Sequence, residues 1–465
     1  MTQLRERLRE LSILTLPLLV EHAFITLMGM VNTAMVASLG EEALSAAGHI
    51  SNAALIPVAL FAAMTTGGTI LVAQAIGARN ERKAAFAGGQ AVALAAVFSV
   101  ALSLVLAVTQ GPTIAWLFGD ADPVMVQHGY IYFIYMNWSL PFLAVAQTLF
   151  GVMRGAGDVK NPMKITLLMN VVNIVLSYVL IVGISVPFTG INIPSLGMHG
   201  AGMAIAIARL AGVICAIWVI MSPKSPIRLN RLRWYKPTKD IQKDIMTLGV
   251  PTGIEQLLFQ IGRMLTQMMI IGMGTAVMAA NIVASNMMAF IMIPGNALTI
   301  SLMVMVGQRV GRREYDDISR TTFFATGVGA VFMVLISLAL MPMGGLIAAA
   351  FSLDAESTVY FRQLFIVLLA GGPLLWPLSF VTPSALRAVN DVKFTMVASV
   401  ATMWIFRIII GYFFGVTLGF GVMGVWVGLY GDWAARSLLF WLRIRRKKWM
   451  KKFEMENSMN MVNGR

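Results

Sequence analysis

The sequence predicts an all-α integral membrane protein with twelve transmembrane helices in two pseudo-symmetric bundles of six. Three observations support this fold class: an apolar composition, basic residues in alternate loops, and an internal repeat. Of the 465 residues, 58% are hydrophobic and 12% are charged, whereas a soluble domain carries about 25% charged residues. The apolar residues form long runs, such as Ala84 to Thr109, and a run of this length spans a hydrocarbon core of about 30 Å as a helix.

Lys and Arg residues fill every second loop of the predicted topology. The basic segments are the N-terminus, 77–83, 154–164, 224–243, 307–314, 387–393 and 443–452, and the loops between them contain neither residue. Basic loops stay on the cytoplasmic side, so we expect both termini in the cytoplasm and a multi-pass protein of the inner (cytoplasmic) membrane. The net charge of +14 then reflects topology and contact with anionic membrane lipid, and we expect no nucleic-acid partner.

The chain contains two copies of one pattern. A shift of 234 positions aligns Pro17 with Pro251 and Glu21 with Glu255, and a shift of 233 aligns RGAGDVK with RAVNDVK. We predict an N-terminal lobe at 1–221, a basic cytoplasmic linker at 222–243, a C-terminal lobe at 244–443 and a basic cytoplasmic tail at 444–465. Both lobes begin and end on the cytoplasmic side, so an axis along the membrane normal should relate them. Two such bundles around a central space are typical of transporters that work by alternating access.

Each lobe carries one glutamate within its first apolar helix. Glu21 lies in PLLVEHAF and Glu255 in PTGIEQLL. A charge near the bilayer centre costs at least about 2.5 kcal/mol, so acidic residues there usually line a cavity or face a partner. We predict that Glu21 and Glu255 couple transport to H⁺ or Na⁺. Two alternatives stay open: each carboxylate reaches back to the cytoplasmic interface, or it satisfies a backbone group freed by the nearby proline.

Other polar residues within the apolar helices are candidates for a cavity wall. Asn32 shares a helix face with Glu21, and Asn170, Asn173 and Ser177 form one polar stripe. Hydrogen bonds between helices are the alternative role for such residues. The predicted lining residues are His22, Asn32, Gln147, Asn170, Asn173, Gln256, Gln260, Arg263 and Thr266.

The sequence indicates no cofactor and no metal site beyond a possible Na⁺ at Glu255. The single cysteine, Cys215, excludes an intrachain disulfide, and the four histidines lack ligand spacing. No catalytic constellation is evident, so we expect a protein that is not an enzyme.

Several stretches together resemble the multidrug and toxic compound extrusion (MATE) family of transporters. They are MVNTAMVASLG (30–40), AQAIGARNERKA (73–84), VMRGAGDVKNP (152–162), LGMHGAGMAIAIA (196–208) and GQRVGRRE (307–314). The resemblance covers about 440 residues in matching order. It implies twelve helices in two lobes, and export of cationic or amphipathic compounds in exchange for Na⁺ or H⁺.

The sequence departs from the family pattern at its acidic residues. Many members have aspartate where this chain has Asn32, and often a second acid where Ser177 stands. The family glutamate of helix 7 usually sits about one turn beyond Glu255, near Phe259, and the acid sometimes found on helix 10 is missing between Leu374 and Leu386. The resemblance therefore implies that coupling relies on Glu21 and Glu255.

These features predict a secondary active efflux transporter. It would be a Na⁺ or H⁺ antiporter that exports small organic cations or amphipathic compounds, acting as a monomer. The alternative is a lipid-linked saccharide flippase of the same superfamily, which would need several arginines in its cavity to bind an anionic headgroup. The sequence offers Arg263 for this role, with Arg209 and Arg407 as further candidates.

Overall fold

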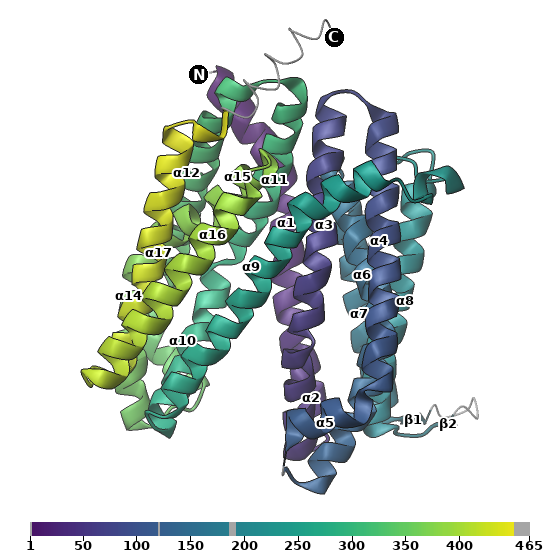
Figure 1. Ribbon diagram of the computed structural model, residues 1–465. Coiled ribbons are helices and arrows are strands. Elements are labelled where there is room, and N and C mark those ends of the chain that lie inside the picture. The colour runs from purple at the N-terminus through teal and green to yellow at the C-terminus, as the bar shows by residue number, and fades with distance from the viewer. Residues whose placement is uncertain (1, 120, 186–191, 451–465) are drawn as a thin grey trace, which may run out of the picture. The chain divides into compact units, whose positions relative to one another are not determined.

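The computed structural model describes residues 2–119, 121–185 and 192–450, and helices make up nearly all of them (Figure 1). The exception is one antiparallel pair of two-residue strands, β1 (Ile184–Ser185) and β2 (Asn192–Ile193). Most of the long loop SVPFTGINIPS and the part of the predicted tail beyond residue 450 lie outside the described residues.

The described residues of the first half of the chain form eight α-helices, which Figure 1 shows from purple to blue-green. They are α1 (Thr2–Ala37), α2 (Glu41–Ala53), α3 (Leu55–Gly77), α4 (Glu81–Val108), α5 (Gln110–Phe118), α6 (Pro123–Gly155), α7 (Lys160–Val182) and α8 (Gly197–Met221). A 3₁₀ turn, η1 (Leu232–Tyr235), follows in the predicted linker.

The second half repeats the plan with more interruptions. Its α-helices are α9 (Lys239–Ile271), α10 (Thr275–Ile291), α11 (Ile293–Arg312), α12 (Tyr315–Leu340), α13 (Gly344–Ala350), α14 (Ala355–Trp376), α15 (Thr382–Ala388), α16 (Val392–Thr402) and α17 (Gly421–Arg445). The 3₁₀ turns are η2 (Met341–Met343) and η6 (Lys448–Met450), and the π-helical segments are η3 (Pro377–Val381), η4 (Met403–Ile410) and η5 (Phe413–Thr417).

Twelve spans are present, as the sequence predicts. Nine stretches of the described chain are long and apolar enough to cross a membrane, and α10 with α11, bent by 43°, can form a tenth. The two further spans are α9 and α17, of 33 and 25 residues, which are long enough but more polar. Helix α9 begins with the charged residues at the end of the predicted linker, and α17 contains Asp432 and Arg436.

The backbone preserves the internal repeat. Gly40 and Gly274, which are 234 positions apart, have φ values of 113° and 110° and precede α2 and α10. Arg79 and Arg313, separated by the same shift, end α3 and α11 with φ values of 55° and 64°. Left-handed conformations are rare for residues other than glycine, so their recurrence at equivalent positions confirms the predicted pseudo-symmetry.

The chain forms two compact units. The N-terminal unit is Val20–Gly253, and the C-terminal unit combines Met1–Leu19 with Ile254–Arg465. The boundaries fall inside α1 and α9, two residues after Pro17 and Pro251. The predicted lobes, 1–221 and 244–443, instead place the boundary in the linker. The predicted and observed boundaries differ because the repeat shows which segments are similar in sequence, whereas contacts determine which segments pack into one unit.

Polar contacts explain why the start of α1 belongs to the C-terminal unit. Arg309 on α11 donates to Glu10 at 2.7 Å, and Thr15 donates to Ser301 at 3.0 Å. Arg309 also pairs with Asp317 on α12 at 2.9 Å, and Arg7 pairs with the same aspartate. These contacts hold the first turns of α1 against α11 and α12.

Close backbone packing explains why the start of α9 belongs to the N-terminal unit. A Cβ added to Gly249 would lie 2.2 Å from the Ala63 carbonyl oxygen on α3, and one added to Gly67 would lie 2.4 Å from the Ile245 carbonyl oxygen. Small residues permit this approach between helices.

The linker packs against the N-terminal unit. Gln90 on α4 is fully buried and donates to the carbonyl oxygens of Trp234 and Lys236 at 2.9 and 2.6 Å. Its Oε1 accepts a hydrogen bond from the Thr238 N–H at 3.2 Å. Burial raises the pKa of the Tyr235 phenol, which donates to the Leu229 carbonyl oxygen. The predicted linker is thus a folded part of this unit.

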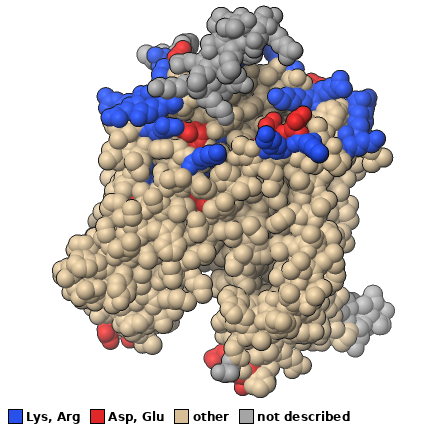
Figure 2. Space-filling view, viewed as in Figure 1, with Lys and Arg blue, Asp and Glu red and all other residues tan. Residues whose placement is uncertain are grey.

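Basic residues at the visible surface gather at one end of each unit (Figure 2). On the face shown in Figure 2, Lys and Arg lie at that end of both units and none is visible at the opposite end. The distribution agrees with the loop pattern from which the sequence predicts the cytoplasmic side.

Candidate functional site

The buried carboxylate of the N-terminal unit belongs to an ion pair. Glu21 is 3% exposed, and its Oε1 accepts hydrogen bonds from Arg154 Nη2 at 2.6 Å and from Thr166 Oγ1 at 2.9 Å. Arg154 lies in the last turn of α6 and begins the basic segment 154–164. The glutamate is therefore stabilised from the basic end of the unit.

The C-terminal unit contains the equivalent pair. Glu255 is 7% exposed, and its Oε1 accepts a hydrogen bond from Arg387 Nη2 at 2.8 Å. Arg387, in the last turn of α15, is the repeat mate of Arg154. Neither alternative drawn from the sequence included this pairing. The signal was present, because the two arginines follow their glutamates by 133 and 132 residues.

Both ion pairs leave hydrogen-bonding capacity unused. Among the described residues, Oε2 of Glu21 and of Glu255 is buried without a hydrogen-bond partner, and so is Nε of Arg154 and of Arg387. A bidentate arginine–carboxylate pair would use both. The open oxygen can accept a proton or a cation before the bond to the arginine breaks.

A polar stripe on α7 continues from the Glu21 pair. Thr166, Asn170, Asn173 and Ser177 recur at helical spacing along one face of α7. Nδ2 of Asn170 and of Asn173 and Oγ of Ser177 are buried without a described hydrogen-bond partner, as is Oδ1 of Asn32 on α1. The stripe is polar but uncharged, and its first residue, Thr166, contacts Glu21.

A cavity of about 650 Å³ lies within the C-terminal unit. It falls in the range of about 300–1,000 Å³ that is typical of small-molecule sites. Of the predicted lining residues, Gln256, Arg263 and Thr266 are in its wall and Gln260 is not. Glu255, which the sequence predicts as a coupling residue, is also in the wall. His22, Asn32, Gln147, Asn170 and Asn173 belong to the N-terminal unit, and their role in a cavity stays a prediction.

Arginine is the charged residue that dominates the cavity wall. Arg263, Arg387, Arg407 and Arg436 line it, and Glu255 is the one acidic residue among the lining residues. Behind the wall, the fully buried Asp432 pairs with both Arg407 and Arg436 at 2.9 Å. Thr402 also donates to Asp432 at 2.9 Å.

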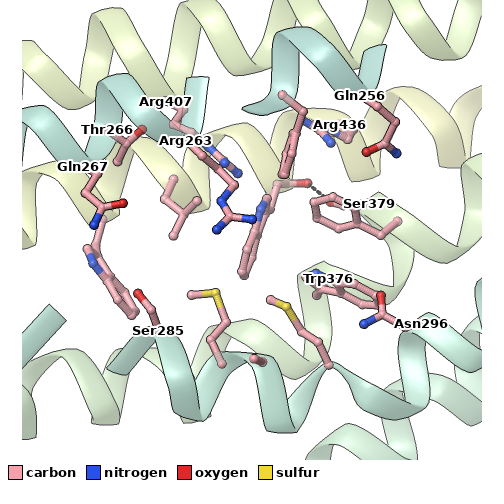
Figure 3. A pocket seen from close by; sticks show the side chains of 18 of the residues that line it. Gln256, Arg263, Thr266, Gln267, Ser285, Asn296, Trp376, Ser379, Arg407 and Arg436 are labelled. Carbon is pink, nitrogen blue, oxygen red and sulfur yellow. Dashed lines mark hydrogen bonds between the residues drawn. The ribbon is translucent and has the colours of Figure 1, made fainter. Parts of the chain in front are cut away.

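Arg263 differs from the other three arginines. No ion pair or hydrogen bond to its side chain occurs within the described chain, and the residue is exposed. Figure 3 shows its side chain extending from α9 into the cavity, toward the side that carries Ser285. Its guanidinium group is thus available to a ligand.

Two π-helical segments supply parts of the wall. Ser379 and Phe380 come from η3, and Arg407 comes from η4. Pro377 and Pro383 lie in and just after η3, and a proline removes one backbone N–H and crowds the preceding turn, which a wider turn relieves. π-Helical turns often occur at functional sites, because they change which side chains face inward.

Much of this wall is not evident from the sequence. Arg387 and Arg436 were not candidates, and neither were the aromatic residues Trp376, Trp426 and Trp433. Asp432 and Arg436 form an i, i+4 pair of opposite charge within an apolar stretch. Such a pair indicates that this face of α17 contacts a cavity or a charged partner.

Comparison with known proteins identifies the family. A family model described as MatE matches residues 17–179 and again residues 251–413. The chain belongs to the MATE family. The two matches are 234 positions apart, which is the shift of the internal repeat. Membership makes the chain a multi-pass membrane transporter of a multidrug efflux family and not an enzyme.

Curated and solved relatives span nearly the whole chain. An uncharacterized transporter, YisQ of Bacillus subtilis (strain 168), is 25% identical and is covered over 94% of both chains. The outward-facing structure of a multidrug resistance MATE family transporter superposes with a TM-score of 0.83 at 19% identity, over 94% of this chain and 95% of that one. A MOP superfamily transporter from Pyrococcus furiosus, described as having a binding pocket of reverse polarity, gives a TM-score of 0.81 at 21% identity over the same shares. These structural likenesses establish the twelve-helix fold.

Proposed function

We propose that this MATE transporter is a secondary active exporter that moves amphipathic small molecules out of the cell in exchange for Na⁺ or H⁺. It would act as a monomer in the inner membrane, with both termini in the cytoplasm, by alternating access of its two lobes. Substrates would enter the cavity of the C-terminal unit. The observation that carries the proposal is the repeated buried pair, Glu21 with Arg154 and Glu255 with Arg387.

The unused carboxylate oxygens give the coupling a physical basis. A proton or Na⁺ bound at Oε2 of Glu21 or Glu255 removes the charge that holds the paired arginine. The arginine then loses its electrostatic partner, and the end of α6 or α15 can move relative to α1 or α9. Binding of a cation is in this way linked to the arrangement of helices. Among the described residues, no group of three or more His, Cys, Asp or Glu is placed to hold a metal, so any Na⁺ would rely on Oε2 and on neutral oxygens.

A gradient experiment in proteoliposomes tests the coupling. Efflux of a fluorescent amphipathic substrate is driven separately by an imposed pH gradient and by an imposed Na⁺ gradient. We expect Glu21→Gln and Glu255→Gln to lower gradient-driven transport by tenfold or more, because glutamine cannot change its charge. Glu356→Gln, at an exposed position at the start of α14, is the matched control and should transport like the wild type.

A charge swap separates coupling from simple stabilisation. Glu255→Arg combined with Arg387→Glu restores an ion pair but moves the carboxylate to α15. We expect the swapped protein to fold, as judged by thermal unfolding, but to transport without response to the gradients. If both glutamine variants pump like the wild type, the coupling proposal is wrong.

The second candidate function, a lipid-linked saccharide flippase, gains support from one observation. A flippase of this kind would need several arginines in its cavity to bind an anionic headgroup, and four arginines line this one. The positive charge of the cavity therefore affects which substrate would bind, whether the protein is an exporter or a flippase.

A further inference from the structure

We infer that the cavity of the C-terminal unit binds the anionic group of an amphipathic substrate, with Arg263 as the residue that contacts it directly. The anion would be a carboxylate, sulfonate or phosphate carried on an aromatic or aliphatic body. The inference rests on the proposed function, because it names the substrate class of the same cavity.

Charge balance is the first argument. Four arginines line the cavity, and the carboxylates that face them are those of Glu255 in the wall and Asp432 behind it. With both acids ionised, two positive charges remain without a counter-charge. Unpaired charge inside a membrane protein is costly. A bound anion would lower that cost, whereas a bound cation would add to it.

The excess charge is concentrated at Arg263 and Arg407. Arg436 and Arg407 share one carboxylate, that of Asp432, and Arg407 lies within electrostatic range of both Arg263 and Arg436. Arg263 has no ion pair within the described chain and is exposed to the cavity. The strongest attraction for an anion is therefore at the Arg263 guanidinium group.

Hydrogen-bond donors also outnumber acceptors in the wall. Among the described lining residues, the buried donors without a partner are Nε of Arg387, Arg407 and Arg436 and Nε1 of Trp433, whereas the buried acceptor without one is Oε2 of Glu255. Buried donors are normally paired. A ligand rich in acceptors, as an oxyanion is, complements this wall better than an ammonium group does.

Two aromatic rings of the wall, those of Phe259 and Phe380, already hold guanidinium groups. Arg407 lies over the Phe259 ring at 5.0 Å, and Arg436 lies over the Phe380 ring at 5.1 Å. These are ordinary cation–π distances. An incoming organic cation would have to compete with a tethered arginine at these two rings.

The remaining wall suits an apolar body attached to the anion. Trp376 and Trp426 line the cavity together with Met288 and Met292. Indole and thioether surfaces pack well against planar or flexible hydrocarbon. The substrate would therefore place its charged end at Arg263 and its body along these side chains.

The inference assigns different roles to the two buried acids. A proton at Glu255 removes negative charge from the cavity that binds the anion, so the two binding events assist each other and cannot drive exchange by competition. Competition between cation and substrate would then depend on Glu21, in the other unit. Neutralising Glu255 should strengthen anion binding, whereas it would weaken the binding of a cation.

A matched pair of probes tests the polarity of the cavity. Both carry the same naphthalene body, one ending in a sulfonate and the other in a trimethylammonium group, and both are titrated against the full-length protein in lipid nanodiscs. We expect the sulfonate to bind at least tenfold more tightly than the ammonium. Arg263→Gln should weaken sulfonate binding by tenfold or more, Arg263→Lys should recover part of the loss, and Glu255→Gln should tighten binding by several fold.

Two controls accompany the titration. Arg362→Gln removes an exposed arginine of α14 that does not line this cavity, and should bind the sulfonate like the wild type. Thermal unfolding of Arg263→Gln should match the wild type, because the side chain makes no described ion pair. Tighter binding of the ammonium probe, or binding of neither probe, would overturn the inference.

A transport experiment distinguishes the source of the anion. In proteoliposomes, one arm follows efflux of the free sulfonate, and the other follows dithionite quenching of a fluorescent phosphatidylglycerol that has crossed the bilayer. Transport in either arm that requires Arg263 supports the inference and identifies a soluble or a lipid anion. Gradient-driven cation efflux that survives Arg263→Gln would contradict the inference and leave the proposed exporter intact. Anion binding without any response to gradients would contradict the exporter and leave the anion site intact.

Discussion

At the scale of single residues, the sequence revealed which acids are buried but not what they contact. Glu21 and Glu255 stand out because a carboxylate is rare in an apolar helix. Their partners, Arg154 and Arg387, lie more than a hundred residues away at the ends of α6 and α15, in basic segments whose arginines already have an explanation in topology. An arginine in a basic segment can set the topology or pair with a buried glutamate. The sequence does not distinguish these two roles, because only the fold shows which arginine lies beside the glutamate.

Asp432 allows a direct measurement of what a buried charge contributes. We expect Asp432→Asn to lower the free energy of unfolding by about 3–5 kcal/mol, because it leaves Arg407 and Arg436 with no buried counter-charge. Arg436→Gln should cost less, since Asp432 keeps its pair with Arg407. Denaturation in detergent measures both, with Glu356→Gln as an exposed control. Equal losses for the two variants would contradict the shared-carboxylate arrangement.

At the scale of elements, hydrophobicity and loop charge predicted the spans well but not their internal breaks. The prolines of the stretch from α14 to α15 are visible in the sequence, and they indicate a disturbance there. The π-helical form of η3 depends on packing around it, and η4 contains no proline at all. The sequence could therefore name Arg407 only as a further candidate for the cavity, because a wider turn shifts every later side chain around the helix axis.

Helix packing within the N-terminal unit can be tested at glycines with different surroundings. A Cβ at position 249 would lie 2.2 Å from the Ala63 carbonyl oxygen, whereas one at position 48 would meet nothing within 4 Å. We expect Gly249→Ala to destabilise the protein by about 1–3 kcal/mol or more, since backbone atoms must move. Gly48→Ala should be neutral or stabilising, because alanine favours helix. Thermal unfolding compares the two, and similar melting temperatures would argue against the contact between α9 and α3.

At the scale of the whole molecule, the repeat predicted more than any single motif. One shift accounts for the equivalent glycines, the left-handed arginines and the two family-model matches. The repeat did not predict where the two compact units divide. The divisions fall inside α1 and α9, just after a proline in each, so each unit includes the start of the first helix of the other repeat. Sequence similarity reports common ancestry of segments, and only contacts such as Thr15 with Ser301 decide where a segment packs.

The repeat also makes a prediction about topology that involves both halves. Because each half begins and ends at a basic segment, Gly111 before α6 and Glu356 at the start of α14 should face the same, external side, although they lie in different halves. Lys83 and Glu314 should face the cytoplasm. With Cys215 replaced by alanine, a single cysteine is introduced at each of these exposed positions, and intact cells are treated with a membrane-impermeant maleimide. We expect labelling at 111 and 356 in intact cells and at 83 and 314 only after the membrane is opened. Labelling of 111 and 356 from opposite sides would mean that the halves are inverted, and an inverted pair could not be related by an axis along the membrane normal.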